Sequence, residues 1–211
     1  MNLEEYKSQY KKDQAVGALS IENRLKEVYS NLEARFYSPQ VMSFQGGDDP
    51  IDGVAVYDND GYKHLISYGM SHLYYNESAV GEEYSKWGFE FTFRVKPVAE
   101  DNGEDPFWVI QLMNNLGRFV NDTKVWFNEY QFLPLGGAIR TDSETDIVGL
   151  AFVKDADLDE IETPHGKVIF LQMVGLNSAQ LKRLENNSSQ EEVMAVLDEI
   201  RVDNPKFVCE L

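Results

Sequence analysis

Cysteine is nearly absent from this sequence, and long apolar runs are absent as well. Cys209 is the single cysteine among 211 residues, so no internal disulfide can form, which favours a reducing compartment. The longest apolar stretch, 168–176, is interrupted by Gln172 and falls short of the roughly 18 residues of a membrane span. The first residues lack a signal-peptide pattern, and Asn2 breaks the myristoylation pattern, so we expect a cytoplasmic protein.

Basic residues are also scarce. Nineteen Lys and Arg stand against 36 Asp and Glu, which gives a formal net charge of −17. Such a surface repels nucleic acid and anionic membranes, so both are disfavoured as partners. It attracts and steers a basic protein partner. Solubility alone also explains an acidic surface, and both interpretations of the charge stand at this point.

The remaining composition is that of a globular domain, with 43% hydrophobic and 12% aromatic residues. A chain of this length buries about 70% of its unfolded surface, so its core needs no metal or disulfide. The first 19 residues are polar, with Leu3, Tyr6 and Tyr10 at the spacing of a short helix. We expect one domain over residues 20–211, preceded by the polar segment 1–19.

Helices are predicted from apolar periodicity and from four capping residues, Ser20, Asp105, Asn177 and Ser189. The first predicted helix carries its apolar stripe from Ile21 to Phe36 and ends at Ser38-Pro39. The second begins with a proline directly after its cap, as helices often do.

Strands are predicted between these helices. They cover residues 41–44, 54–57, 63–68, 87–95, 125–133, 147–153 and 167–174, with an edge strand expected within 203–211. In 87–95, aromatic and apolar residues alternate strictly with Gly88, Glu90, Thr92 and Arg94. Hairpin-length turns and interspersed helices predict an α/β (α+β) fold, with a mixed β-sheet packed by helices on at least one face.

Catalytic groups do not converge in this sequence. His64 and His72 are eight residues apart, which matches no metal-binding pattern on a single face, even with a carboxylate such as Glu82. His165 lies in a turn, and Cys209 has no neighbouring base. Separate hydrogen-bonding histidines are the favoured interpretation, so no catalytic residue, metal or cofactor is predicted.

Acidic residues cluster between residues 141 and 165. This segment holds eight acids against one basic residue, Lys154. Such clustering costs self-repulsion unless another group compensates for it. A docking surface for a basic partner and a pair of exposed acidic loops around a buried strand are equally good interpretations.

Four motifs in this order resemble the Suppressor of fused family. Residues 46–52 (GGDDPID) are similar to its Gly-Gly-x-Asp-Pro-Leu-Asp stretch, and 64–74 (HLISYGMSHLY) to His-Tyr-Ile-Ser-Phe-Gly-Leu-Ser-Asp-Leu-Tyr. Residues 88–96 (GFEFTFRVK) are similar to Gly-Phe-Glu-Leu-Thr-Phe-Arg-Leu-Lys, and 163–175 (TPHGKVIFLQMVG) to Thr-Pro-Phe-Gly-Val-Val-Thr-Phe-Leu-Gln-Ile-Val-Gly. The resemblance covers residues 20–211 and identifies the chain as a member of the bacterial single-domain branch.

The resemblance implies a Suppressor of fused-like domain without a catalytic role. Animal members clamp an extended peptide of a transcription factor between two domains by strand addition. This chain ends after the first of those domains, so the clamp is not expected. Where the animal domain has Gly-Asp-His on its peptide-binding side, residues 128–132 read NEYQF, which points to Glu129 and Tyr130 as contacts.

Stand-alone bacterial members imply a specific role, that of an immunity protein that neutralises a toxin encoded beside it. A basic toxin domain suits the charge of −17. A regulator that sequesters a peptide segment of a partner such as a transcription factor is the alternative. A hydrolase or metal enzyme using His64, His72 or His165 is a third. The predicted partner contacts are Glu129, Tyr130, Asp142, Glu144, Asp146, Asp155, Asp157, Asp159 and Glu160.

Overall fold

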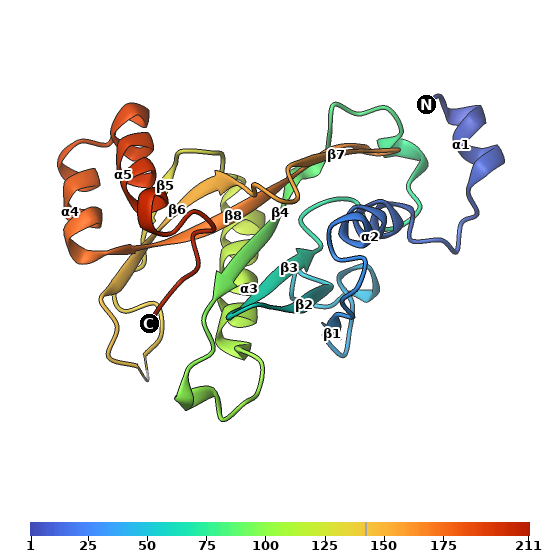
Figure 1. The fold of residues 1–211 in the computed structure, drawn as a ribbon. Coiled ribbons are helices and arrows are strands. Elements are labelled where there is room, and N and C mark those ends of the chain that lie inside the picture. Colours follow the sequence, from blue (N-terminus) through green and yellow to red (C-terminus); the bar gives the residue numbers. More distant parts are fainter. Residues whose placement is uncertain (142) are drawn as a thin grey trace.

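The computed structural model describes residues 1–141 and 143–211. Within these residues eight strands form one mixed sheet in the order β1-β2-β3-β4-β8-β6-β5, with β7 paired to β8 outside that path (Figure 1). Strands β4 and β8 are parallel, and the other pairings are antiparallel. The prediction of a mixed sheet packed by helices is confirmed.

The elements have the following bounds. The strands are β1 Arg35–Tyr37, β2 Gly53–Asn59, β3 Tyr62–Tyr68, β4 Tyr84–Val95, β5 Phe132–Pro134, β6 Ile147–Lys154, β7 Glu160–Thr163 and β8 Gly166–Asn177. The helices are α1 Leu3–Gln9, α2 Val16–Val28, α3 Phe107–Thr123, α4 Ser178–Asn186 and α5 Gln190–Asp203. Short 3-10 turns are η1 Ser43–Gln45, η2 Glu77–Ala79 and η3 Ala99–Asp101.

One face of the sheet is covered by α3, which lies behind β4 and β8 in Figure 1. The predicted aromatic stripe of β4 packs on this face, where Phe91 and Phe93 are fully buried. The apolar stripe of α3 supplies the opposing side chains, Val109, Met113, Leu116 and Val120. Each large side chain buried here stabilises the fold by about 1.5–3 kcal/mol.

Two separate groups of helices cover the opposite face (Figure 1). Helix α2 packs through Ile21 and Leu25 on β2 and β3, and helices α4 and α5 pack through Leu184 and Val196 on β6 and β8. The caps expected for α4 and α5 are present, because the side chains of Asn177 and Ser189 accept backbone N–H groups of the first turns.

Between these two groups the sheet carries a polar seam, which consists of His64, Thr92, Arg94, Asp155 and Gln172. All five side chains are withdrawn from solvent. Arg94 Nη2 lies 2.8 Å from Asp155 Oδ1, and Arg94 Nη1 donates to Gln172 Oε1 at 2.5 Å. Thr92 donates to the other carboxylate oxygen of Asp155 at 2.9 Å. Buried charges require this degree of pairing, so the seam specifies how β3, β4, β8 and the loop after β6 fit together.

Glu90 is a further buried acidic residue on the same face of β4. Its carboxylate accepts hydrogen bonds from the hydroxyls of Ser67 and Ser71, both at 2.6 Å, and from the backbone N–H of Gly69 at 3.0 Å. Burial raises the pKa of Glu90, and these hydrogen bonds oppose that shift. Glu90 therefore holds the turn after β3 in place.

The predicted helix from Ser20 to Phe36 is wrong at both ends. Helix α2 begins at Val16, and the Ser20 hydroxyl donates to the Val16 carbonyl inside the helix. The chain then turns, and β1 pairs with β2. Phe36 lies in β1 because its ring packs edge-on to Tyr68 and covers Gly53, a long-range contact that helical spacing does not reveal.

Other local predictions are also corrected. The predicted strand over residues 41–44 is wrong, because residues 43 and 44 belong to η1. There Asp52 accepts hydrogen bonds from the backbone N–H and the hydroxyl of Ser43. Asp105 does not cap α3, because its carboxylate accepts hydrogen bonds from Arg35, Tyr37 and Lys63. Within 125–133 only the last two residues are strand, and within 203–211 a single bridge joins Val95 and Cys209.

No helix among residues 1–141 and 143–211 has the length and apolar character needed to span a membrane.

Candidate protein-binding surface

An aromatic cavity of about 430 Å³ opens between the start of β4 and the segment that follows α3. Its lining residues include Tyr84, Trp87, Phe89, Trp126, Phe127 and Tyr130. The rings of Trp87 and Trp126 lie 5.9 Å apart in an edge-to-face arrangement, and the Lys124 ammonium lies over Trp87. Such a cavity can take an apolar side chain of a partner, as clefts lined by aromatic residues generally do.

Large apolar side chains are exposed at this cavity, where Tyr84 and Trp126 line it, and next to it, where Val125 precedes Trp126 and Phe119 stacks on Phe127. Trp126 is 50% exposed, its neighbour Val125 is 57% exposed, and Tyr84 and Phe119 are exposed to a similar extent. Grouped exposure of this kind marks interaction sites on soluble proteins, whereas single exposed apolar residues do not. This feature was not predicted from the sequence, although the run Val125-Trp126-Phe127 directly after a helix could have signalled it.

Glu129 and Tyr130 lie between the cavity and β5. Both residues line the cavity, and Glu129 Oε1 accepts the backbone N–H of Lys154 at 3.1 Å. Tyr130 has a positive φ of 61°, and its backbone N–H donates to Phe152 at 2.8 Å. These bonds hold the segment against β6, so two of the predicted contacts lie at one place.

Strand β5 forms one edge of the sheet. It pairs with β6 on one side, and no other strand of the described chain pairs with it. An edge strand presents backbone groups that an extended peptide can pair with. The aromatic cavity and this edge are adjacent in the chain, because Glu129 and Tyr130 line the cavity and β5 begins at Phe132. We group them as one candidate surface, called here the β5 surface and defined by Trp87, Trp126, Glu129, Tyr130 and β5.

The acidic segment is largely neutralised by the fold. Asp155 is fully buried in the polar seam, so the expectation of an exposed contact is wrong for this residue. Burial by itself would raise its pKa, but the hydrogen bond from His64 and the charge of Arg94 hold the pKa of Asp155 far below its ordinary value. The residues next to Asp155 in the sequence do not predict this low pKa, because Arg94 comes from β4, which is distant in the chain.

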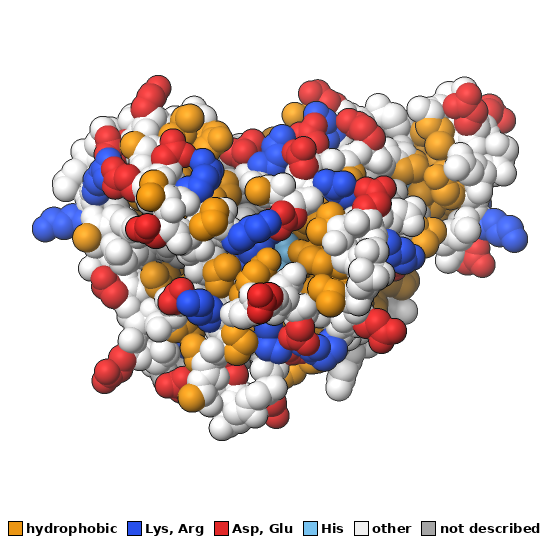
Figure 2. Space-filling model, viewed as in Figure 1, with side chains coloured by type: hydrophobic (Ala, Val, Ile, Leu, Met, Phe, Trp, Pro, Cys, Tyr) orange, Lys and Arg blue, Asp and Glu red, His pale blue; other side chains and the backbone are white. Residues whose placement is uncertain are grey.

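The acids that follow Asp155 mostly have basic partners. Asp157 lies 3.0 Å from Arg94 and 2.5 Å from Lys206, and Glu160 lies within 3.0 Å of both Lys154 and Lys167. Figure 2 shows the same intermingling of Lys and Arg with Asp and Glu over the face that carries α2, α4 and α5.

The less neutralised acids of the predicted set lie elsewhere. Glu144 is exposed, Asp159 is exposed with Lys154 at 3.3 Å, and Asp146 accepts the Ser178 hydroxyl at 2.9 Å near the start of α4. Asp142 lies outside the described residues. The structure therefore does not gather all the predicted acidic contacts into a single patch.

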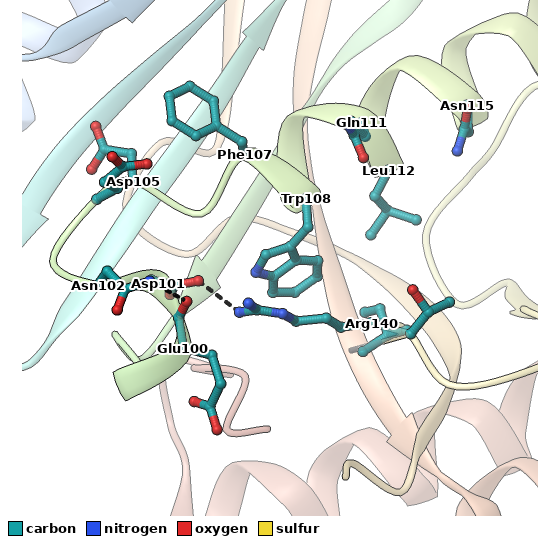
Figure 3. Close-up of a pocket in the computed structure, with 13 residues that line it drawn as sticks. Glu100, Asp101, Asn102, Asp105, Phe107, Trp108, Gln111, Leu112, Asn115 and Arg140 are labelled. Carbon is teal, nitrogen blue, oxygen red and sulfur yellow. Dashed lines mark hydrogen bonds and ion pairs between the residues drawn. The ribbon is translucent and has the colours of Figure 1, made fainter. Parts of the chain in front are cut away.

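A second cavity of about 630 Å³ lies at the start of α3 (Figure 3). One wall consists of η3 and the residues after it, the other of Trp108, Leu112 and Arg140. Arg140 reaches across to Asp101, with 2.6 Å between Nη1 and Oδ1. The carboxylates of Glu100 and Glu104 also line this cavity, so its electrostatic character is acidic.

The three histidines do not form a metal centre. His64 lies in the polar seam, where Tyr29 contacts its Nδ1 and its Nε2 is 3.1 Å from Asp155. His72 and His165 lie near each other at another place, with ring centroids 6.0 Å apart. Among residues 1–141 and 143–211, no group of three or more His, Cys, Asp or Glu residues could hold a metal ion.

The fold and the β5 surface define an α/β domain with a mixed sheet and a surface suited to protein side chains. Comparison with known sequences adds the family. The sequence model of "Suppressor of fused protein (SUFU)" matches residues 47–210. This chain belongs to the Suppressor of fused family, whose members are in general binding proteins rather than enzymes. The resemblance inferred from the four motifs is confirmed.

Two curated relatives show the extent of the similarity. The Suppressor of fused homolog of Homo sapiens is 31% identical over 164 residues, which covers 71% of this chain and 33% of the human protein. The homolog of Mus musculus matches with the same identity and coverage. The match thus spans about one third of the length of these relatives.

Solved structures show the same fold. A chain in the Sufu-Fu complex crystal structure superposes with a TM-score of 0.83 at 24% identity, covering 94% of this chain and 91% of that chain. Drosophila Suppressor of Fused gives a TM-score of 0.83 at 23% identity over 95% of this chain and 51% of that one. The putative homolog from Neisseria gonorrhoeae gives 0.62 at 12% identity, covering 87% and 89%.

Proposed function

We propose that this chain is a stoichiometric protein-binding domain that acts in the cytoplasm as an immunity protein and neutralises a cognate basic toxin domain. The binding unit is the Suppressor of fused-like domain over residues 20–211. The observation that carries protein binding is the aromatic cavity with Trp126 half exposed on its rim. Aromatic anchors of this kind supply much of the affinity at protein interfaces.

The choice of a basic partner is supported by charge. The net charge of −17 steers a cationic domain toward this protein and disfavours nucleic acid as a ligand. Within the predicted acidic set, Glu144 and Asp159 are the exposed groups that retain the most unbalanced charge, together with Asp146. Glu129 adds a carboxylate at the β5 surface itself.

A second candidate function is sequestration of an extended peptide from a regulatory partner. The β5 edge supports it, because β5 offers backbone pairing beside a cavity for side chains. The Sufu-Fu complex shows that a protein with this fold forms a complex with another protein. A partner held through an extended segment would favour this second function over toxin neutralisation.

The test is capture of the partner from the native host with the wild-type chain, with identification by mass spectrometry and measurement of affinity by calorimetry. A toxin domain at one-to-one stoichiometry is expected, and protection of cells from that toxin should follow. A transcription factor segment would support the second function instead. Absence of any protein partner would contradict both.

Trp126→Ala assigns the binding to the β5 surface. Removal of a half-exposed aromatic anchor should weaken partner binding by about 2 kcal/mol, roughly 30-fold, with little change in stability. Val202→Ala is the matched control, because Val202 is 80% exposed near the end of α5 and does not line the cavity, whereas Gln190 at the start of that helix does. Equal affinities of the two variants would show that the partner binds elsewhere.

A further inference from the structure

The buried contact of helix α1 with the rest of the molecule is made by one side chain, and the ion pair of Lys7 with Glu77 adds an exposed contact. Tyr6 is the single buried residue of α1, and its side chain is fully withdrawn from solvent. The residues that connect α1 to α2 begin with the half-buried Tyr10 and continue with Lys11 and Lys12, which are exposed. In Figure 1 α1 stands beside the sheet without packing on either of its faces. A helix of seven residues is unstable by itself in water, so its order depends on this anchor.

The Tyr6 anchor is a relay of three hydrogen bonds. The backbone N–H of Asn76 donates to the Tyr6 hydroxyl at 3.0 Å, and that hydroxyl lies 2.7 Å from His165 Nε2. His165 Nδ1 lies 3.2 Å from the backbone carbonyl of His72. A carbonyl can only accept, so Nδ1 carries the proton, and Nε2 has the lone pair that accepts the Tyr6 proton.

Protonation of His165 is incompatible with this relay. A proton on Nε2 would point at the Tyr6 hydroxyl, so this hydroxyl could no longer donate to Nε2 and the Tyr6 proton would lose its acceptor. The imidazolium would also be buried, because His165 is fully withdrawn from solvent. Undocking of α1 would relieve both costs by opening the site to water.

We propose that α1 is a strap that is released when His165 becomes protonated. While docked, α1 contacts η2, and its Tyr6 contacts Asn76 and also His165 in the turn between β7 and β8. Release would uncover the ring of Tyr75, which lies 4.8 Å from that of Tyr6, together with the imidazole of His165. The strap thus couples mild acidification to a change in the surface that this end of the molecule presents.

The neighbouring titratable groups support histidine as the responding residue. From the segment after β3, His72 lies beside His165; Glu82 faces both imidazoles, and Lys86 faces His72. On the α1 side, Lys7 pairs with Glu77 at 3.0 Å, an exposed contact that contributes little. Burial lowers the pKa of His165, and burial together with His165 lowers the pKa of His72.

The direction of the pH effect follows from the pKa of His165. Because docking lowers it below the ordinary value of about 6.5, docking is at full strength above that pH and weakens as the pH falls toward the docked pKa. Within this window one proton makes the docking constant fall about tenfold per pH unit. Below the docked pKa the effect is complete.

Hydrogen exchange of residues 3–9, followed by mass spectrometry and corrected for the intrinsic rate, measures the docking constant directly. The wild-type protein should lose about tenfold in protection per pH unit below about pH 6.5. His165→Phe should abolish that dependence, and Lys7→Gln, which removes only the exposed ion pair, should retain it. Tyr6→Phe should lower protection roughly 5- to 150-fold at pH 7.5, since both hydrogen bonds of the Tyr6 hydroxyl are lost.

Two results would overturn the proposal. One is unchanged protection of α1 between pH 7.5 and the docked pKa of His165, measured by NMR titration of its imidazole. The other is an equal pH dependence in His165→Phe, which would assign the response to another group. Circular dichroism of each variant establishes that the sheet domain is folded, and if His165→Phe does not fold, Tyr6→Phe and the wild-type titration decide the question.

Discussion

Arg94 Nη2 and Asp155 Oδ1 lie 2.8 Å apart in the centre of the sheet, and neither side chain reaches solvent. Arg94 belongs to β4, which the sequence predicts, while Asp155 follows β6 and is one of eight acids in a segment that resembles an exposed loop. The pair has further support from Thr92, Gln172 and the backbone of the Asp155 loop. The structure therefore turns a predicted docking residue into a central element of the fold.

Asp155→Asn should destabilise the protein strongly. It removes the buried carboxylate that pairs with the Arg94 guanidinium and leaves only the partly exposed Asp157 beside it, and loss of one partner of a buried ion pair costs about 3–5 kcal/mol. Asp159→Asn, four residues away and exposed, is the matched control and should stay within about 0.5 kcal/mol of wild type. Urea unfolding at pH 7 measures both values. Similar stabilities of the two variants would show that the polar seam does not stabilise the fold.

Acid should weaken the contact between β1 and the start of α3. The Arg35 guanidinium beside Asp105, despite partial burial, holds the pKa of Asp105 well below its ordinary value. A carboxyl with a lowered pKa stabilises the folded state above its unfolded pKa of about 3.9, and this stabilisation is lost as the pH falls toward the folded pKa. We expect Asp105→Asn to cost about 1.5–3 kcal/mol at pH 7.

The comparison of Asp105→Asn with wild type is made by urea unfolding from pH 7 down to about pH 3. The stability difference between the two proteins should shrink below about pH 4 as Asp105 in the unfolded wild-type chain becomes protonated. A difference that stays constant over this range would show that the charge of Asp105 is not what matters.

Gly17→Ala should destabilise the protein although alanine favours helices. A Cβ at Gly17 would lie 1.9 Å from the backbone carbonyl oxygen of His72, and the N–H of Gly17 donates to Leu73 at 2.8 Å. Overpacking against backbone costs about 1–3 kcal/mol, which exceeds the gain of roughly 1 kcal/mol in helix propensity. Gly137→Ala, where nothing lies within 4 Å, is the control. A Gly17→Ala protein more stable than wild type would contradict the close approach of α2.

Charge changes in the acidic set should separate exposed from neutralised residues. Glu144→Lys should slow association with a basic partner several-fold at low salt and lose its effect at high salt, because an exposed charge acts by steering. Glu160→Gln should change the rate less, since Lys154 and Lys167 already balance that carboxylate. Stopped-flow association at two salt concentrations measures the difference. A larger effect at Glu160 than at Glu144 would contradict this assignment of the steering charge.

The candidate site was predictable only in part. The family motifs pointed to Glu129 and Tyr130, and both line the aromatic cavity. The cavity itself depends on Trp87 from β4 meeting Trp126 from the segment after α3, a contact between residues far apart in the chain. The neutralisation of the acidic segment could not be predicted for a related reason. The cations that balance its carboxylates come from β4, β8 and the end of the chain, and they are Arg94, Lys167 and Lys206.

The sequence by itself determined the strands with strict alternation, the caps of α4 and α5, and membership of the family. These features depend on spacing within one element, so the local pattern contains them. Only the tertiary structure decided that Phe36 lies in a strand, that Asp155 is buried and that Tyr6 anchors α1 on His165. Each of these outcomes depends on a partner distant in sequence, and burial against such a partner outweighs the local preference of the residue.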